Sequence, residues 1–256
     1  MANSQGSFAW HELATTDPAA AATFYSRITS WSTQSSDYSD DYMLLMKDHT
    51  TEGGIEAIGR HPVAGADKPH WMPYVCVYDV DACARQVKTL GGQLRVGPRE
   101  VPNVGCWAVI ADPQGALIGM YEPEASPRPG ASQPTSGDFS WHELVTTDFK
   151  AAFDFYRPLF QWEKTGEFDM GEMGTYFMFG QHGQTYGGIF NRVPDMPPPS
   201  WLSYICVDDV DAAANSVKQV GGNVILGPMD VPGGDRIVQA LDPQGAWFAL
   251  HTVAKR

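Results

Sequence analysis

The sequence of 256 residues has little positive charge, no long apolar run and few cysteines. Seventeen Lys and Arg stand against thirty Asp and Glu, which gives a formal net charge of −13. Nucleic acids and anionic membranes attract basic surfaces, so we expect neither as a partner. No apolar stretch approaches the roughly 20 residues of a membrane span, and the first residues lack the pattern of a signal peptide. We therefore expect a cytoplasmic protein.

The four cysteines show no C-x-x-C spacing, and a chain of this length does not need disulfide bonds to fold. This pattern indicates a reducing compartment. Hydrophobic residues make up 43% of the chain and aromatic residues 12%. A chain of this size can bury roughly 70 to 75% of its unfolded surface, so disorder is not expected.

What the sequence does contain is an internal repeat. The segment 8–17 (FAWHELATTD) returns as 139–148 (FSWHELVTTD), and the segment 112–116 (DPQGA) returns as 242–246. Between the copies, residues 123–137 include four prolines and three serines, a composition typical of a linker. We therefore predict two domains, 7–122 and 138–253, joined by the linker 123–137.

Each copy has the pattern of a strand, a helix and further strands, repeated twice. Asp17 followed by Pro18 is typical of a helix start. A second helix is expected to be capped by Asp81, and Asp211 is its equivalent in the other copy. Glycine pairs at 91–92 and 221–222 end these helices. Four units of strand, helix and about three strands predict an α+β protein of tandem βαβββ units, in which paired units wrap a curved sheet around a cleft.

These motifs resemble the vicinal oxygen chelate superfamily, which includes glyoxalase I, bleomycin-resistance proteins and extradiol dioxygenases. The resemblance rests on the Asp-capped helix with Phe24-Tyr25, the helix start at 79–82 (DVDA) and the hairpin D-P-Q-G, all present twice. It implies two glyoxalase-like domains, each a pair of units forming a cupped sheet. Within the superfamily, the chain is most similar to two-domain glyoxalase-like proteins of the hydroxylase or 27 kDa antigen type.

The resemblance also implies where a divalent metal would be held. Family members usually bind it with His, Gln or Glu on the inner faces of the sheets, where it takes vicinal oxygens of a substrate. Three of the four usual positions can be counted from the motifs, and this chain has Trp10, Met72 and Gly119 there in the first copy and Trp141, Leu202 and Ala249 in the second. None of these is a ligand for a hard or borderline cation. The fourth position falls near Ile55 and Ile189. We therefore expect no metal and no other cofactor, although a metal at displaced positions stays open.

Residues two along a strand from a ligand position point to the same face. In the first copy these are Glu12, Tyr74 and Tyr121, and in the second copy they are Glu143, Tyr204 and His251. Together with Trp10 and Trp141, they predict aromatic and acidic clefts that would stack a flat organic ligand. His11 and His142, next to the two glutamates, should point away from the clefts.

Two interpretations of the second copy remain open. Glu143 and His251 could act as an acid–base pair, or as a displaced metal site completed by Tyr204 or water. Alternatively, Glu143 pairs with a nearby donor and His251 is a half-buried residue at a strand end.

The function predicted first is binding of a small aromatic or dicarbonyl-type molecule without a metal. One alternative is a metal-dependent lyase, isomerase or dioxygenase that uses displaced ligands. Another is a non-catalytic interaction protein. Both a monomer and a homodimer are compatible with the sequence.

Overall fold

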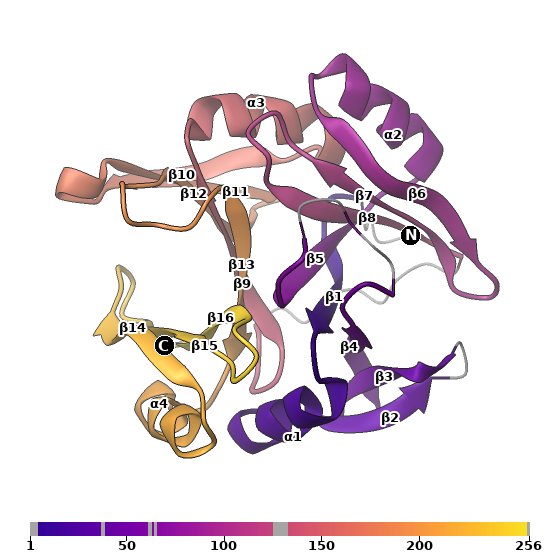
Figure 1. The fold of residues 1–256 in the computed structure, drawn as a ribbon. Helices are drawn as coiled ribbons and strands as arrows, with labels where there is room; N and C mark the ends of the chain where they lie inside the picture. The colour runs from indigo at the N-terminus through magenta and orange to yellow at the C-terminus, as the bar shows by residue number, and fades with distance from the viewer. Residues whose placement is uncertain (1–4, 37–38, 61–62, 64–65, 125–132, 255–256) are drawn as a thin grey trace. The chain divides into compact units, whose positions relative to one another are not determined.

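The structure is a computed structural model that describes residues 5–36, 39–60, 63, 66–124 and 133–254 (Figure 1). Within these residues, the first half contains two βαβββ units. The elements of the first half are β1 (Phe8–Thr15), α1 (Pro18–Ile28), β2 (Ser32–Ser36), β3 (Ser39–Lys47), β4 (Thr50–Ala57), β5 (His70–Cys76), α2 (Val80–Thr89), β6 (Gln93–Val101), β7 (Gly105–Ala111) and β8 (Leu117–Pro123).

The second half repeats this order, with one added 3₁₀ turn at Gly171–Met173. Its elements are β9 (Phe139–Thr146), α3 (Phe149–Phe160), β10 (Glu163–Asp169), β11 (Thr175–Gln181), β12 (Gln184–Asn191), β13 (Ser200–Cys206), α4 (Val210–Gln219), β14 (Asn223–Asp230), β15 (Arg236–Leu241) and β16 (Trp247–Thr252). Each half forms one eight-stranded sheet, in the orders β2-β3-β4-β1-β5-β8-β7-β6 and β10-β11-β12-β9-β13-β16-β15-β14. The predicted α+β class with tandem βαβββ units is confirmed.

The helix starts follow the sequence motifs, with one correction. The side chain of Asp17 accepts a hydrogen bond from the backbone N–H of Ala20 and caps α1. The predicted caps at Asp81 and Asp211 are wrong, because α2 and α4 are capped by Asp79 and Asp209. These two residues have the extended backbone of a cap, whereas Asp81 and Asp211 lie inside the first turn.

The outermost strands are the elements that were not predicted from the sequence. β2 and β10 are polar and largely exposed, so they carry no alternation of apolar residues. β6 and β14 also lie at sheet edges. None of the helices in the described parts of the chain is long and apolar enough to cross a membrane.

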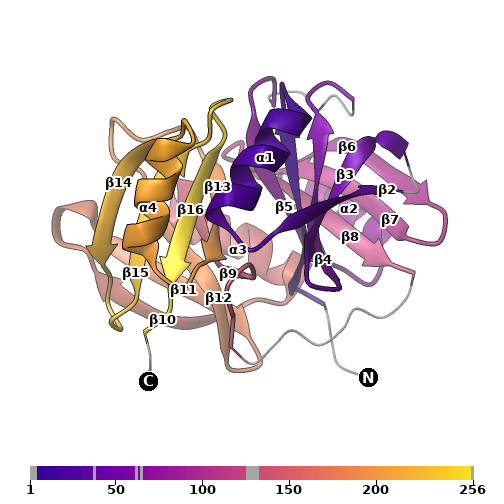
Figure 2. The same cartoon turned by 90° about the horizontal axis from the view of Figure 1, so that it is seen from below.

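The chain divides into two compact units, and each takes one βαβββ unit from each half of the sequence. The first unit comprises Met1–Trp10, Met72–Gly130 and Trp141–Trp201, and the second comprises His11–Trp71, Ala131–Ser140 and Leu202–Arg256. In the first unit α2 contacts α3 (Figure 1), and in the second unit α1 contacts α4 (Figures 1 and 2). Each unit has its own hydrophobic core. The compact units therefore do not coincide with the two sequence copies.

In the second unit, a buried hydrogen-bonded chain joins a helix of one half to a hairpin of the other. The indole Nε1–H of Trp71 donates to the Tyr25 hydroxyl at 2.8 Å, and this hydroxyl donates to Asp242 Oδ2 at 3.1 Å. The other carboxylate oxygen of Asp242 accepts the backbone N–H groups of Gln244 and Ala246. Burial raises the pKa of Tyr25 well above its usual value and also raises the pKa of Asp242.

The first unit contains the same chain with the halves exchanged. Trp201 Nε1 lies 3.3 Å from the Tyr156 hydroxyl, which donates to Asp112 Oδ2 at 3.0 Å. The Phe-Tyr and D-P-Q-G motifs therefore have a structural role, since each hairpin aspartate accepts a hydrogen bond from a tyrosine hydroxyl of the other half. Trp71 and Trp201 are buried and pack in these cores.

The linker predicted at 123–137 is described only at its two ends, because residues 125–132 lie outside the described residues. Its C-terminal end packs on the second unit. The indole Nε1–H of Trp31 donates to the carbonyl oxygen of Gly137 at 2.8 Å, and the Ser30 hydroxyl donates to the carbonyl oxygen of Ser136.

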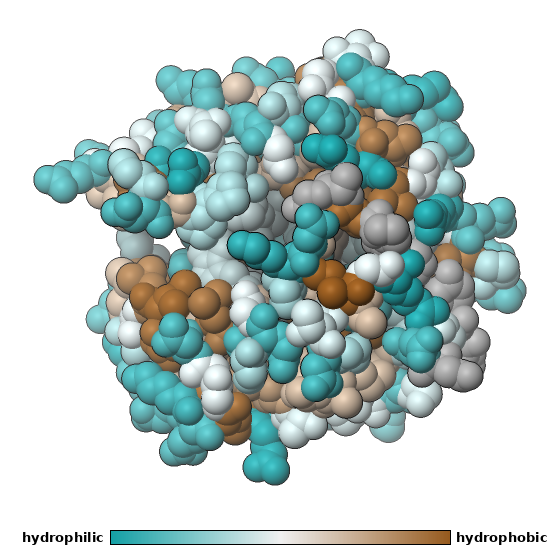
Figure 3. Space-filling model, in the orientation of Figure 1, coloured by the Kyte–Doolittle hydropathy of each residue, from teal (hydrophilic) through white to brown (hydrophobic). Residues whose placement is uncertain are grey.

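The edge strand β14 exposes apolar side chains. Ile225, Leu226 and Met229 are 41 to 47% exposed, and Figure 3 shows hydrophobic atoms gathered over this strand. At the positions of Ile225 and Met229, strand β6 carries Arg95 and Arg99. The two halves thus keep the same fold but differ in chemistry at equivalent edge positions.

Candidate functional site

The first unit presents an aromatic surface on one side of the half-sheet β5-β8-β7-β6. Ala108 and Ile110 of β7 lie in the hydrophobic core, so Trp107 and Val109 point to the opposite side. Register places further residues on the side opposite the core. We call this surface the Trp107 face, and it consists of Tyr74, Arg99, Trp107, Gly119 and Tyr121.

A tyrosine ring fills the space above Gly119 on the Trp107 face. Tyr74 and Gly119 are direct neighbours on β5 and β8. A Cβ atom at Gly119 would lie 2.1 Å from Tyr74 Cδ1, a distance that no side chain could accept. Gly119 is one of the positions where the resemblance placed a metal ligand. The ring of Tyr74 occupies that space instead.

On this face Trp107 and Tyr121 are half-buried, Tyr74 is buried and Arg99 is exposed. The Trp107 ring lies 6.3 Å from the ring of Tyr74, at an interplanar angle of 77°. The guanidinium carbon of Arg99 lies 5.8 Å from the centre of the Trp107 ring. Tyr121 donates its hydroxyl to the carbonyl oxygen of Val104 at 2.9 Å, and burial raises its pKa. Trp107 and Arg99 were not predicted from the sequence, although the alternation of W-A-V-I in β7 would have placed Trp107 beside Tyr121.

Glu12 belongs to the second unit, where a tyrosine holds its carboxylate. The Tyr42 hydroxyl donates to Glu12 Oε2 at 2.9 Å. Gly54 pairs with Glu12 in the sheet, and a Cβ atom at Gly54 would lie 2.1 Å from the Tyr42 hydroxyl oxygen. The glycine therefore allows the tyrosine to lie across the strand and reach the glutamate.

The same arrangement recurs at Glu143 in the first unit. The Tyr176 hydroxyl donates to Glu143 Oε2 at 2.9 Å and accepts the indole N–H of Trp141 at 2.8 Å. Gly188 pairs with Glu143 and leaves room for the Tyr176 ring. The interpretation that Glu143 pairs with a nearby donor agrees with this geometry. Neither Tyr42 nor Tyr176 was selected from the sequence, because they lie 30 and 33 residues from their glutamates.

His251 forms a hydrogen-bonded cluster in the second unit. Its Nδ1 lies 2.9 Å from the Ser140 hydroxyl, and its Nε2 lies 3.2 Å from Asp235 Oδ2. Burial lowers the pKa of His251, and Asp235 opposes this shift. A neutral ring can donate Nε2–H to Asp235 and accept the Ser140 proton at Nδ1. Nearby, the Tyr204 hydroxyl accepts a hydrogen bond from the side chain of Gln239 at 3.0 Å.

The predicted pairing of Glu143 with His251 stays a prediction, because these residues belong to different compact units. The other predicted site residues are also divided: Trp10, Tyr74, Tyr121 and Trp141 lie in the first unit, and Glu12 and Tyr204 lie in the second.

The two histidines beside the glutamates pack against aromatic rings. His142 stacks on Phe8 with ring centroids 3.5 Å apart, and His11 stacks on Phe139 at the same distance. Both histidines are buried. Burial lowers the pKa of His142 to about 3.

The residues present do not fit the divalent metal of the fold. No group of three or more His, Cys, Asp or Glu side chains among the described residues is arranged to hold a metal ion. Glu12 and Glu143 each accept a tyrosine hydroxyl, and both ring nitrogens of His251 have partners. We therefore derive no chemical step through a metal.

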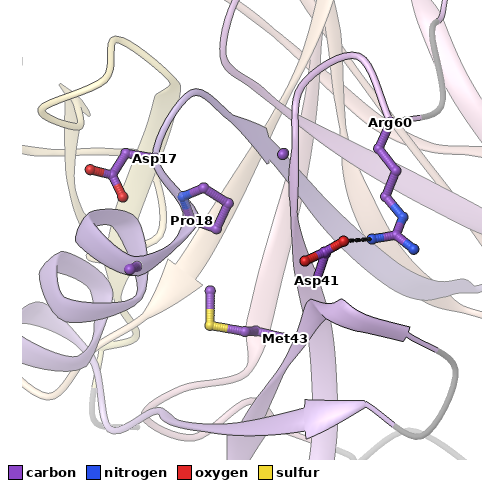
Figure 4. Close-up of a pocket in the computed structure, with 7 residues that line it drawn as sticks. Asp17, Pro18, Asp41, Met43 and Arg60 are labelled. Carbon is purple, nitrogen blue, oxygen red and sulfur yellow. Dashed lines mark ion pairs between the residues drawn. The ribbon is translucent and has the colours of Figure 1, made fainter.

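A surface hollow of about 480 Å³ lies in the second unit, and Figure 4 shows its lining. Asp41 and Arg60 form an ion pair at 3.6 Å on one side of it. The residues that line the hollow include none of the predicted site residues; they are Asp17, Pro18, Ala19, Asp41, Met43, Ala57 and Arg60. We therefore do not take this hollow as the functional site.

Comparison with known proteins agrees with the fold and the repeat. The profile of the Glyoxalase/Bleomycin resistance protein/Dioxygenase superfamily matches residues 139–250, and a Glyoxalase-like domain profile matches residues 10–119. "Putative glyoxylase CFP32" of Mycobacterium tuberculosis (strain CDC 1551 / Oshkosh) is 30% identical over 96% of this chain and 94% of that protein. The chain belongs to the glyoxalase/bleomycin resistance protein/dioxygenase superfamily. It is thus a member of the vicinal oxygen chelate superfamily, as the motifs indicated.

Other members of the superfamily are similar over nearly the whole chain. The anthracycline biosynthesis protein DnrV of Streptomyces peucetius is 30% identical over 96% of this chain and 92% of that protein. Among solved structures, the Mn(II)-bound glyoxalase from Novosphingobium aromaticivorans has a TM-score of 0.67 at 15% identity, with 98% of this chain and 83% of that chain covered. At this identity the structural likeness shows the fold alone.

Proposed function

We propose that this superfamily member binds a small aromatic molecule on the Trp107 face, without a metal. The observation that carries the proposal is the ring of Tyr74 above Gly119. It replaces a ligand position by an aromatic surface, which Trp107 extends. Aromatic side chains bind flat ligands by stacking and by burial of apolar area.

Two of the relatives support an aromatic ligand. DnrV and the similar DauV of Streptomyces sp. (strain C5) are named as anthracycline biosynthesis proteins, and anthracyclines are polycyclic aromatic compounds. The half-buried rings of Trp107 and Tyr121, backed by the buried ring of Tyr74, suit such a compound better than they suit a small dicarbonyl compound, which offers little area for stacking.

The proposal is tested with purified protein and a panel of naphthalene derivatives and α-dicarbonyl compounds. We expect the naphthalene derivatives to quench tryptophan fluorescence and to bind in equilibrium dialysis. In the variant Trp107→Leu, we expect affinity to fall by about ten-fold, because stacking on one indole contributes roughly 1 to 1.5 kcal/mol. The matched control is Trp247→Leu, since Trp247 of β16 lies outside the Trp107 face.

Failure of every naphthalene derivative to bind would overturn the proposal and would favour a non-catalytic interaction protein. Elemental analysis after titration with Zn²⁺, Ni²⁺, Mn²⁺ and Fe²⁺ provides a second test. Stoichiometric metal that is lost in Glu143→Ala or His251→Ala would favour the metal-dependent enzyme instead.

A second candidate function is proton transfer by His251. The observation in its favour is the hydrogen-bonded series Asp235, His251 and Ser140, which fixes the orientation of a neutral imidazole. Because burial lowers the pKa of His251, the ring is neutral near neutral pH, and Ser140 Oγ can take a proton from a bound substrate as the Ser140 proton passes to Nδ1 of the ring. A compound whose turnover is lost in His251→Gln, while naphthalene binding is unchanged, would favour this function.

A further inference from the structure

Arg99 gives the Trp107 face a positive charge in a strongly acidic protein. It is exposed on β6 and pairs directly with Trp107 on β7. At 5.8 Å from the ring centre, its guanidinium lies near the outer limit of about 6 Å for a cation–π contact. Such a contact at an exposed site is weak, so the guanidinium can turn toward an incoming anion.

The acidic residues nearest in register lie on the other side of the sheet. Glu100 pairs with Cys106, and Cys106 pairs with Glu122. Because side chains alternate along a strand, this row points away from the side that carries Arg99, Trp107 and Tyr121. Glu122 is also engaged there, since its Oε2 accepts the backbone N–H of Val80 at the start of α2. In the part of the chain that the structure describes, no ion pair joins Arg99 to either glutamate.

The second half has no such charge at the equivalent positions. Its row is Met229, Ile237 and His251, in the same register as Arg99, Trp107 and Tyr121. The fold therefore does not require an arginine or a tryptophan at these places. The pair of Arg99 and Trp107 is a chemical difference confined to one half.

We propose that the Trp107 face selects an aromatic ligand that carries an anionic group, a carboxylate or a phenolate, and that Arg99 binds this group. The ring of the ligand stacks on Trp107, and the guanidinium donates two N–H groups to the two oxygens of a carboxylate. This inference rests on the proposed function and adds the charge of the ligand to it.

The test compares 2-naphthoate with 2-naphthalenemethanol, which have the same ring system and differ in charge. We expect the full-length protein to bind the anion about ten-fold more tightly in equilibrium dialysis at 50 mM salt. In Arg99→Met, which introduces the residue of the second half, affinity for 2-naphthoate should fall about ten-fold, while affinity for 2-naphthalenemethanol should change less than two-fold. Arg99→Lys should lose part of the affinity, because lysine keeps the charge but not the paired donors.

The matched control is Arg95→Met, which removes one positive charge from the same strand. Arg95 is exposed and does not pair with Trp107. If Arg95→Met and Arg99→Met lower the affinity for 2-naphthoate equally, the effect is due to long-range electrostatics and the inference is wrong. If both probes bind equally to the unmodified protein, the inference is wrong while the proposed function stands. If neither probe binds, both fail.

Discussion

At the scale of single residues, the motifs that identify the superfamily are hydrogen-bonding partners in the core. The D-P-Q-G aspartates hold their own hairpins through backbone N–H groups, and each also accepts a tyrosine hydroxyl from the other half. Buried polar groups are costly without partners, so these contacts determine which residues can be changed.

We expect Tyr156→Phe to destabilise the protein by roughly 1 to 3 kcal/mol. The change removes one hydroxyl and leaves Asp112 Oδ2 and the indole N–H of Trp201 without this buried partner. Urea unfolding measures the free energy. The matched control, Tyr78→Phe, should change it by less than about 0.5 kcal/mol, because Tyr78 is 60% exposed. Equal effects of the two changes would contradict a role for the Tyr156 hydroxyl.

His142 should make stability depend on pH. The pKa of His142 in the folded protein, about 3, lies below the ordinary value of 6.5. Between these two pH values the unfolded chain therefore binds a proton at His142 that the folded chain does not bind. The stability due to neutral His142 is therefore present above pH 6.5 and is lost as the pH falls, by about 1.4 kcal/mol per pH unit at most.

Urea unfolding between pH 6.5 and 5 measures this slope. We expect His142→Phe to have a smaller slope than the unmodified protein, because phenylalanine keeps the stacking on Phe8 without a titrating group. His70 and His251 also have lowered pKa values and contribute to the slope of both proteins. An unchanged slope in His142→Phe would show that His142 is protonated in the folded protein as readily as in the unfolded chain.

The sequence predicted part of the candidate site at this scale. Period-two alternation placed Tyr74 and Tyr121 on one side of the sheet, and register confirms that side. The partners of Glu12 and Glu143 could not be found in this way, because a tyrosine reaches each glutamate across a neighbouring strand. Arg99 was missed because β6 was not placed, and its pairing with Trp107 depends on a bulged register.

At the scale of the elements, glycines allow tyrosine rings to lie across the strands. Gly54, Gly188 and Gly119 each face a tyrosine ring from an adjacent strand. The sequence analysis counted glycine at position 119 as a lost ligand. The structure adds that this glycine makes room for Tyr74.

We expect Gly54→Ala to cost roughly 1 to 3 kcal/mol of stability, because the added methyl group overlaps the Tyr42 ring. The hydrogen bond from the Tyr42 hydroxyl to Glu12 would be lost as well. The double variant Gly54→Ala, Tyr42→Ala removes the overlap, so its cost should be smaller than the sum of the two single changes. Thermal or urea unfolding of all four proteins measures this coupling. Strict additivity would contradict the overlap.

The elements were predicted where local chemistry is strong. Asp-Pro, the glycine pairs and D-P-Q-G marked helix starts, helix ends and one hairpin in each half. The caps of α2 and α4 were displaced by two residues, because the D-V-D motif offers two aspartates and only backbone geometry distinguishes them. β2 and β10 were missed because exposed edge strands need no apolar face.

At the scale of the whole molecule, the repeat in the sequence and the packing of the chain divide the residues differently. Each core takes helices and strands from both halves. The sequence revealed four units, but it could not reveal which of them share a core, because equivalent units have nearly the same apolar pattern.

The two halves expressed separately, as residues 1–124 and 133–256, should not fold as stable monomers. Each would lack the βαβββ unit that completes its part of each core, together with the partner of its tyrosine or hairpin aspartate. Circular dichroism and urea unfolding of each half should show no cooperative transition, whereas an equimolar mixture should recover one. A cooperative transition in either half alone, with the half shown to be monomeric, would establish that half as an independent domain.

The exchange of tyrosine and aspartate between the halves has a consequence for how the chain can diverge. A substitution at Asp112 affects Tyr156, and one at Asp242 affects Tyr25, so neither copy can change these positions alone. The sheet surfaces are under no such mutual restriction, and there Trp107 already corresponds to Ile237. In a duplicated scaffold of this kind, the paired core positions have to change together, whereas the sheet surface of one copy can change without the other.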